Sequence, residues 1–117
     1  MKKKSINKKN YKNKISVIIP TYNEQNTIKE ILKKVKSIKL KKEIIVINDG
    51  SNDNTSKILK SLKNKYINIL LNLKKNKGKG YAIRQGLKKA SGEIIIIQDA
   101  DLEYDPQDYY NLVNPIL

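Results

Sequence analysis

Short apolar runs alternate along this chain with longer segments whose apolar residues are spaced three and four positions apart. The runs, which predict buried strands, lie at residues 15–19, 43–48, 67–71 and 93–98. The segments with the wider spacing, which predict amphipathic helices, lie at residues 26–36, 54–63, 80–90 and 108–113. Strands that alternate with helices of about ten residues indicate βαβ units with right-handed crossovers. The pattern therefore predicts an α/β fold with a mainly parallel sheet and flanking helices.

Four details of this pattern make specific predictions. Pro20 follows the first apolar run and is expected to end that strand, because proline donates no hydrogen bond to a sheet. The four isoleucines at 94–97 predict a strand buried on both faces. Asp53 or Asn54 is the expected cap of the second helix. The sequence stops within or just after the fourth helix, and we expect the first half of a longer domain, truncated after the fourth βα unit.

Length and composition limit the possible chemistry. At 117 residues the chain is long enough for one domain with a real core. It contains no cysteine and no histidine, which excludes disulfide frameworks, thiolate or imidazole metal sites, and Ser-His or Cys-His catalysis. No apolar stretch reaches the roughly 20 residues of a membrane span, and no apolar segment follows the first lysines as in a signal peptide. A cytoplasmic location is the expectation.

The formal net charge of +14 raises the question of an anionic partner. We do not expect a nucleic acid, because Arg84 is the only arginine and the seven tyrosines are not clustered among the lysines. Lysines are concentrated in residues 1–13, which we expect to form a solvated, disordered basic tail. The alternative for this tail is peripheral contact with an anionic membrane, at about 1 kcal/mol per lysine near the surface.

Polar clusters follow all four expected strands. They lie at residues 20–24, 48–55, 76–80 and 99–101. Because the carboxyl ends of parallel strands share one edge of a sheet, these clusters converge on one rim, where open α/β sheets bind their ligands. The helices begin at the same rim, and helix N-termini favour anions. Ordinary turn and capping chemistry is the alternative for any single cluster, but it explains four together poorly.

Asp99 and Asp101 indicate a metal site at this rim. Two carboxylates two residues apart repel each other unless a cation lies between them. Oxygen ligands suit Mg²⁺ or Mn²⁺, whose coordination is usually completed by substrate phosphates. The loop at 76–80 fits neither of two common phosphate motifs. A P-loop requires a hydroxyl residue where Gly80 stands, and a dinucleotide fingerprint requires a glycine where Ile83 stands.

Four segments resemble, in order, the signatures of family 2 glycosyltransferases. They are 20–24 (PTYNE), 48–53 (NDGSND), 76–82 (NKGKGYA) and 99–103 (DADLE). The longer run 99–106 (DADLEYDP), with the Gly-Lys-Gly loop, is most similar to the polyprenyl-phosphate or dolichyl-phosphate-type sugar synthases. The resemblance covers residues 14–117 and implies a Rossmann-like GT-A fold, of which this chain supplies the nucleotide-sugar-binding part.

The resemblance also implies an activity, namely transfer of a sugar from a nucleoside diphosphate sugar to an acceptor. A polyprenyl phosphate is one candidate acceptor. Transfer in this family inverts the anomeric centre by direct displacement, with Mg²⁺ or Mn²⁺ stabilising the departing diphosphate. By the same resemblance Pro20, Tyr22 and Glu24 line the nucleoside pocket, with Glu24 reaching the ribose. Asp49 accepts a hydrogen bond from the ring N–H of the base.

The last two motifs supply the other implied site residues. Gly78 and Gly80 are implied to allow close backbone approach, and Lys79 to meet the base or the phosphates. Asp99 and Asp101 are implied to hold the ribose and the metal, with Asp101 as the main metal ligand.

The chain departs from the family pattern at two positions. Asn48 stands where many relatives carry aspartate, which matters little if Asp49 contacts the base. Glu103 stands where some lipid-phosphate sugar synthases carry glutamine, and both metal binding and solvent exposure stay open for it. Acceptor-binding elements are not visible, so no catalytic residue is assigned.

Two other function classes also stay open. One is a nucleotidyltransferase-like enzyme, whose Gly-rich loop would stand where residues 20–22 (PTY) lie. The other is a non-catalytic module that binds a nucleotide or a membrane.

Overall fold

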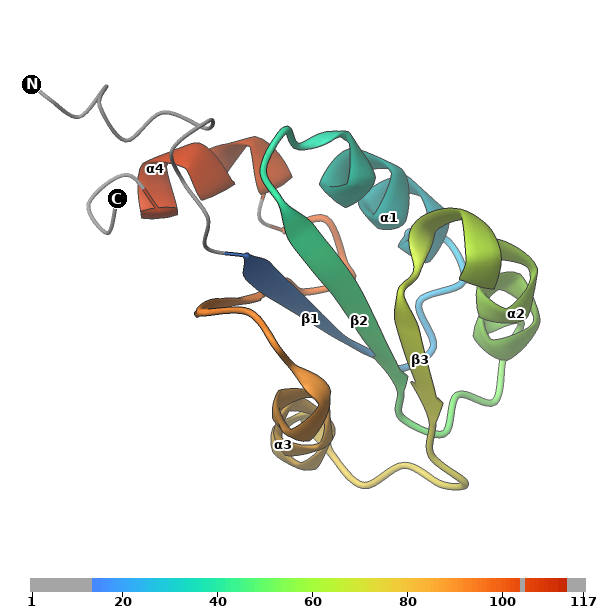
Figure 1. Ribbon diagram of the computed structural model, residues 1–117. Coiled ribbons are helices and arrows are strands. Elements are labelled where there is room, and N and C mark those ends of the chain that lie inside the picture. The colour runs from blue at the N-terminus through green and yellow to red at the C-terminus, as the bar shows by residue number, and fades with distance from the viewer. Residues whose placement is uncertain (1–13, 104, 114–117) are drawn as a thin grey trace, which may run out of the picture.

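Four parallel strands form one sheet at the centre of the molecule (Figure 1). The computed structural model describes residues 14–103 and 105–113. The strands are β1 (Ile15–Thr21), β2 (Lys42–Asn48), β3 (Ile69–Asn72) and β4 (Ile94–Ile97), and their order in the sheet is β3-β2-β1-β4. All three pairings are parallel, with Val17 opposite Ile44 on one side and Ile96 on the other. The expected parallel sheet of an α/β fold is confirmed.

Helices cover the two faces of this sheet unequally. They are α1 (Ile28–Ser37), α2 (Thr55–Tyr66), α3 (Lys79–Lys89) and α4 (Tyr109–Val113), with the short 3-10 helix η2 (Pro106–Asp108) leading into α4. Figure 1 shows α1 and α2 on one side of the sheet and α3 on the opposite side. The connections through α1 and α2 build the sheet outward from β1 to β3, whereas α3 returns the chain to the other side of β1. The direction of strand order therefore reverses between β1 and β4.

The core has two layers because alternate residues of a strand point to opposite faces. On the larger face, the inward side chains of all four strands pack against the buried residues of α1, α2 and α4. On the other face, Ile18, Ile45 and Ile47 pack beneath Ala82 of α3. Gly86 lets α3 approach closely, since a Cβ atom there would lie 2.7 Å from Ile47 Cδ1 and 2.8 Å from Ile18 Cγ2.

The prediction that the isoleucine strand is buried on both faces is wrong. In β4, Ile94 and Ile96 are buried, whereas Ile95 is 39% and Ile97 40% exposed. Two features explain the difference. β4 pairs with β1 alone among the described strands, and α3 packs over β1 and β2 rather than over β4.

The prediction that Pro20 ends the first strand is also wrong, because β1 continues to Thr21. Gln98 N donates to Ile18 O, so the peptide groups at Ile18, and by alternation at Pro20, face the β4 side of β1. The paired part of β4 ends at Ile97, opposite Ile18. The missing N–H of Pro20 therefore falls where no further ladder bond to β4 exists, and the strand tolerates the proline.

Several smaller differences concern the ends of elements. β3 begins at Ile69 rather than at 67, and α2 extends to Tyr66 rather than to 63. Asn54 stands at the N-cap of α2 without a side-chain cap bond, while the carboxylate of Asp53 accepts the N–H of Thr55 at 2.8 Å. Within the described part of the chain, no helix combines the length and apolarity required to cross a bilayer. The basic segment 1–13 and the chain end, 114–117, lie outside the described residues.

A buried carboxylate joins the strands at the edge of the sheet opposite the polar rim. Glu43 accepts hydrogen bonds from Ser16 Oγ at 2.6 Å, from Ser91 N at 2.6 Å and from Ser91 Oγ at 3.0 Å. Lys14 Nζ lies 3.6 Å from the same carboxylate. Burial alone would raise the pKa of Glu43, but the hydrogen bonds and Lys14 outweigh it, so the pKa lies below its usual value. Glu43 thus ties the approach to β4 onto β1 and β2.

We predict that Glu43→Gln lowers the free energy of unfolding by about 1–3 kcal/mol. The glutamine amide would face the Ser91 N–H either with its NH₂ group, which cannot accept a hydrogen bond, or with its neutral oxygen, which accepts a weaker one than a carboxylate. Since folding lowers the pKa of Glu43, its contribution is present above the unfolded value of about 4.5 and is lost as pH falls through the folded value. Urea unfolding at pH 7 and at acid pH measures both effects. Glu93→Gln, at an exposed position just before β4, is the matched control. Equal stability of the two variants at pH 7 would contradict the assignment.

Candidate functional site

A pocket of about 340 Å³ lies at the carboxyl ends of the strands, where the strand order reverses between β1 and β4. It is lined by Pro20, Thr21, Tyr22, Glu24, Asp49, Asn76, Lys79, Asp99, Ala100, Asp101 and Glu103. All four polar clusters that follow the strands contribute to this lining. The pocket lining therefore includes every site residue expected from the sequence except Gly78 and Gly80. Gly78 contacts the pocket residue Asp49 through its backbone N–H, and Gly80 follows Lys79 in the first turn of α3. Such a crevice is where open α/β sheets bind ligands.

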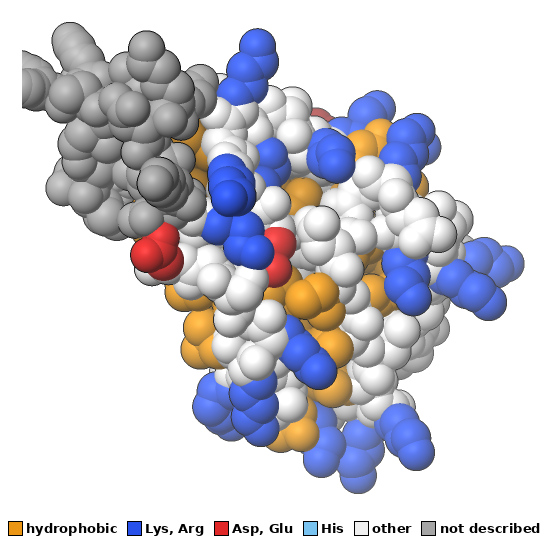
Figure 2. Space-filling view, viewed as in Figure 1, with side chains coloured by type: hydrophobic (Ala, Val, Ile, Leu, Met, Phe, Trp, Pro, Cys, Tyr) orange, Lys and Arg blue, Asp and Glu red, His pale blue; other side chains and the backbone are white. Residues whose placement is uncertain are grey.

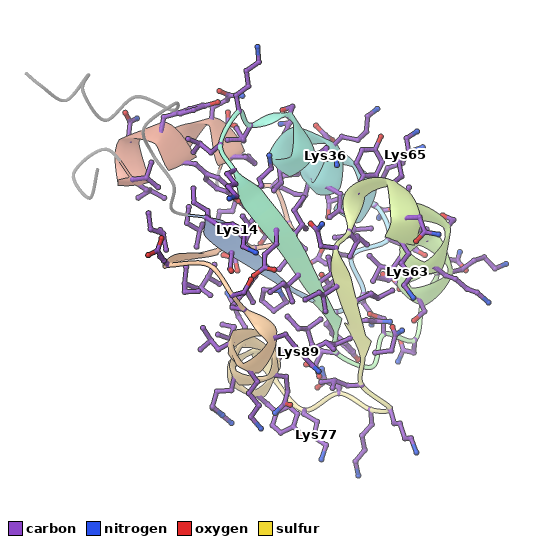
Figure 3. The ribbon with its side chains drawn as sticks, viewed as in Figure 1. Lys14, Lys36, Lys63, Lys65, Lys77 and Lys89 are labelled. Atoms are coloured by element: carbon purple, nitrogen blue, oxygen red, sulfur yellow. The ribbon has the colours of Figure 1, made fainter. Side chains whose placement is uncertain are left out.

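Five carboxylates and one ammonium group line the pocket, although the chain as a whole carries a formal charge of +14. Figure 2 shows basic side chains spread over the visible face rather than gathered in one groove. The lysines labelled in Figure 3 come from separate elements, such as Lys36 on α1, Lys63 on α2 and Lys89 on α3. The pocket thus concentrates negative charge on a basic protein, and a lining of this sign attracts cations.

Asp49 organises the loop that follows β3. Its side chain is almost fully buried and accepts three hydrogen bonds, from Asn76 Nδ2 at 2.9 Å, Lys77 N at 2.8 Å and Gly78 N at 2.9 Å. The neighbouring Gly50 has a φ of 69°, and a Cβ atom there would lie 2.4 Å from Asn76 N. The loops after β2 and β3 are consequently packed backbone to backbone.

The loop after β1 is held by side-chain amides. Asn23, with a φ of 52°, donates from Nδ2 to Asn52 Oδ1 at 2.9 Å and accepts from Asn52 N at 2.8 Å. Its own N–H donates to Ser51 Oγ at 3.0 Å. These bonds fix the backbone between Tyr22, which is 41% exposed at the rim, and the partly buried Glu24. The sequence motif indicated both pocket residues but not the reciprocal bonding of Asn23.

Asp99, Asp101 and Glu103 form an acidic cluster in the loop after β4. Carboxylate oxygens of the three residues all lie within 4.8 Å of one another. Asp101 Oδ1 also accepts the N–H of Glu103 at 3.0 Å. The set contains only oxygen donors, as Mg²⁺ and Mn²⁺ prefer. The structure thus places Glu103, whose role the sequence left open, beside the two aspartates and exposed to solvent.

Residues outside the motifs anchor the start of this acidic loop. Thr27 Oγ1 donates to the carbonyl of Ala100 at 2.5 Å. Behind the loop, Tyr109 Oη donates to Gln98 Oε1 at 2.7 Å, and Gln98 Nε2 donates to the carbonyl of Asp99 at 3.1 Å. Burial raises the pKa of Tyr109, so its hydroxyl stays a donor at neutral pH. These anchors depend on contacts distant in sequence, and no local motif signals them.

Lys79 enters the pocket from the first turn of α3 and forms an ion pair with Asp99. The hydrogen bond that Lys79 donates to Asp99, together with the charges of Asp99, Asp101 and Glu103, holds the pKa of Lys79 above its usual value. The ammonium group is therefore charged at any pH near neutrality.

Comparison with known sequences identifies a family for this region. The family model described as glycosyl transferase family 2 matches residues 16–117. A poly-β-1,6-N-acetyl-D-glucosamine synthase of Staphylococcus aureus is 39% identical over 100 residues, which are 85% of this chain and 24% of the relative. An undecaprenyl-phosphate 4-deoxy-4-formamido-L-arabinose transferase of Proteus mirabilis is 37% identical over 107 residues, covering 86% of this chain and 33% of the relative. The chain thus spans about a quarter to a third of the length of these relatives.

Solved structures give the same result for the fold. The mannosyltransferase PcManGT from Pyrobaculum calidifontis, in complex with GDP-Man and Mn²⁺, matches with a TM-score of 0.79 and 30% identity over 89% of this chain and 32% of that one. Residues 1–349 of S. aureus TarS, in complex with UDP-GlcNAc, match with a TM-score of 0.72 and 28% identity over 87% of this chain and 31% of that one. The expected GT-A fold is confirmed for the part that the chain covers.

We predict that Asp49→Asn loosens the loop at 76–78, because the amide keeps the shape of the side chain but turns an N–H₂ group toward N–H donors. The local opening free energy should fall by about 1.4–2.7 kcal/mol, which accelerates amide exchange at Lys77 and Gly78 about ten- to a hundredfold. Hydrogen exchange followed by NMR measures this change. Asp53→Asn, which makes the same charge change at the start of α2, should leave both amides protected. Unaltered protection in Asp49→Asn would show that the carboxylate does not hold the loop.

Proposed function

The chain belongs to glycosyl transferase family 2, and from this membership we propose that its pocket binds a nucleoside diphosphate sugar as the donor for glycosyl transfer. One observation carries the proposal: the loops that follow all four strands line one pocket, and three clustered carboxylates belong to that lining. A nucleoside diphosphate requires both a contact surface for the nucleoside and a cation for the diphosphate. Two structural neighbours in complex with GDP-Man and Mn²⁺ or with UDP-GlcNAc support this choice of ligand.

We propose that the loops after β1 and β2 receive the nucleoside. Tyr22 and Pro20 offer an apolar surface at the rim, and Glu24 offers a carboxylate to ribose hydroxyls. Asp49 Oδ1 accepts one hydrogen bond in the structure, from Lys77 N. A carboxylate oxygen has two acceptor positions, so Oδ1 retains one for a ring N–H of the base. The same side chain would then both hold the loop at 76–78 and contact the base.

We propose that Asp101 is the main ligand of a divalent cation, with Asp99 shared between the ribose and the cation. Glu103 is within reach as a third oxygen ligand, because its carboxylate lies in the same 4.8 Å cluster. When bound, Mg²⁺ or Mn²⁺ supplies Lewis-acid stabilisation of the departing diphosphate. The backbone near Gly78 and Gly80 is open to phosphate groups, since a Cβ atom at Gly78 would meet nothing within 4 Å.

We further propose that residues 14–117 act as the donor-binding part of the glycosyltransferase domain. A polyprenyl phosphate is the acceptor that we favour, a choice supported by the undecaprenyl-phosphate transferase among the relatives. Contact of segment 1–13 with an anionic membrane stays a prediction, since that segment lies outside the described residues.

Calorimetric titration of UDP and GDP, with and without Mn²⁺, tests the donor site. We expect Mn²⁺ to tighten binding of the preferred nucleotide at least about tenfold, which corresponds to about 1.4 kcal/mol. Asp101→Ala should abolish this gain because it removes the main metal ligand. Asp108→Ala removes an exposed carboxylate just beyond the acidic loop and should retain the gain. Nucleotide binding that ignores both Mn²⁺ and Asp101→Ala would refute the proposal.

A further inference from the structure

Lys79 forms an ion pair with Asp99, one of the carboxylates proposed to bind the cation. Among the pocket-lining residues that the structure describes, Lys79 is the one basic side chain, and its ammonium group pairs with Asp99 Oδ1. Asp99 belongs to the cluster in which carboxylate oxygens of Asp101 and Glu103 lie within 4.8 Å. Three carboxylates at such separations repel one another strongly unless a positive charge offsets them. The ammonium group of Lys79, paired with Asp99, supplies such a charge.

We propose that Lys79 is a displaceable counter-ion, which holds Asp99 in the free protein, competes there with the divalent cation, and moves to the diphosphate when a nucleotide binds. This inference rests on the proposed donor site and assigns to Lys79 a part in the order of binding. Lysine suits such an exchange, because its ammonium group is a compact charge on a flexible chain.

The surroundings of Lys79 permit the movement. Its side chain is 58% exposed, whereas that of Asp99 is 21% exposed, so the lysine is the more solvent-accessible partner of the pair. Glycines flank it on both sides: a Cβ atom at Gly78 would meet nothing within 4 Å, and one at Gly80 would approach only Arg84 Nη1, at 3.6 Å. Because more than half of the Lys79 side chain faces solvent and its neighbours in the chain carry no side chains, it can leave Asp99 without displacing packed atoms.

The exchange couples the two ligands. A cation that takes Asp99 frees Lys79 for the phosphates, and a nucleotide that draws Lys79 away frees Asp99 for the cation. Each ligand then raises the affinity of the other by the same factor, in addition to their direct contact. Measured exposed ion pairs set the size of this contribution at about two- to fivefold in affinity.

Titration of Mn²⁺ in the absence of nucleotide tests the inference directly, with folding of each variant verified by circular dichroism. Lys79→Met should bind Mn²⁺ about two- to fivefold more tightly than the wild-type chain, because Asp99 is then no longer paired with an ammonium group. It should also show a smaller gain in Mn²⁺ affinity upon addition of UDP or GDP. Arg84→Met removes a positive charge from an exposed position of the same helix and controls for the general change in charge.

The possible outcomes separate this inference from the proposed function. The counter-ion role is overturned if Lys79→Met binds Mn²⁺ without nucleotide no more tightly than the wild-type chain does. It is also overturned if Arg84→Met raises the Mn²⁺ affinity by the same factor. If the wild-type chain still binds a nucleotide in a Mn²⁺-dependent manner, the proposed donor site holds even though the counter-ion role does not. If the wild-type chain binds neither Mn²⁺ nor a nucleotide, both proposals fail.

Discussion

Parallel pairing of the central strand β1 with β2 on one side and β4 on the other is the constraint on which the site depends. The register places Thr21 opposite Asn48 and Ile18 opposite Ile97, so the loops that follow all three strands leave from one edge. The strand order reverses at this point, which is where open α/β sheets bind their ligands. The pocket is therefore a consequence of topology, and the carboxylates occupy it because they follow the strands.

Hydrogen bonds between the loops hold this rim in place. Asp49 fastens the loop after β3, Asn23 fastens the loop after β1 to that after β2, and Thr27 fastens the acidic loop. Ordering a loop on binding costs affinity, so loops ordered during folding leave more of the contact energy for the ligand. The pair of Lys79 and Asp99 differs from these bonds, because its lysine is exposed and can exchange one partner for another.

Periodicity and the polar clusters were sufficient to predict the elements, the parallel sheet and the rim, since each depends on residues close in sequence. They failed for Ile95, Ile97 and Pro20, because periodicity does not tell which strand lies at an edge or where its ladder ends. The pairing of Asp49 with Gly78, and of Lys79 with Asp99, depends on contacts across 29 and 20 positions. The motifs named these residues individually, but only the fold shows which of them bind each other.

The central claim is that a divalent cation binds at the acidic loop of this pocket. NMR spectra recorded during addition of substoichiometric Mn²⁺, with UDP or GDP present, test it most directly because the paramagnetic ion broadens nearby signals. The account predicts that amide signals of residues 99–103 broaden first, followed by those of Tyr22 and Lys79. Signals of Glu43 and Ser91 should persist, since they lie at the opposite end of β1, a seven-residue strand of about 20 Å. Uniform broadening, or broadening centred on exposed acids such as Glu30 and Glu93, would contradict it.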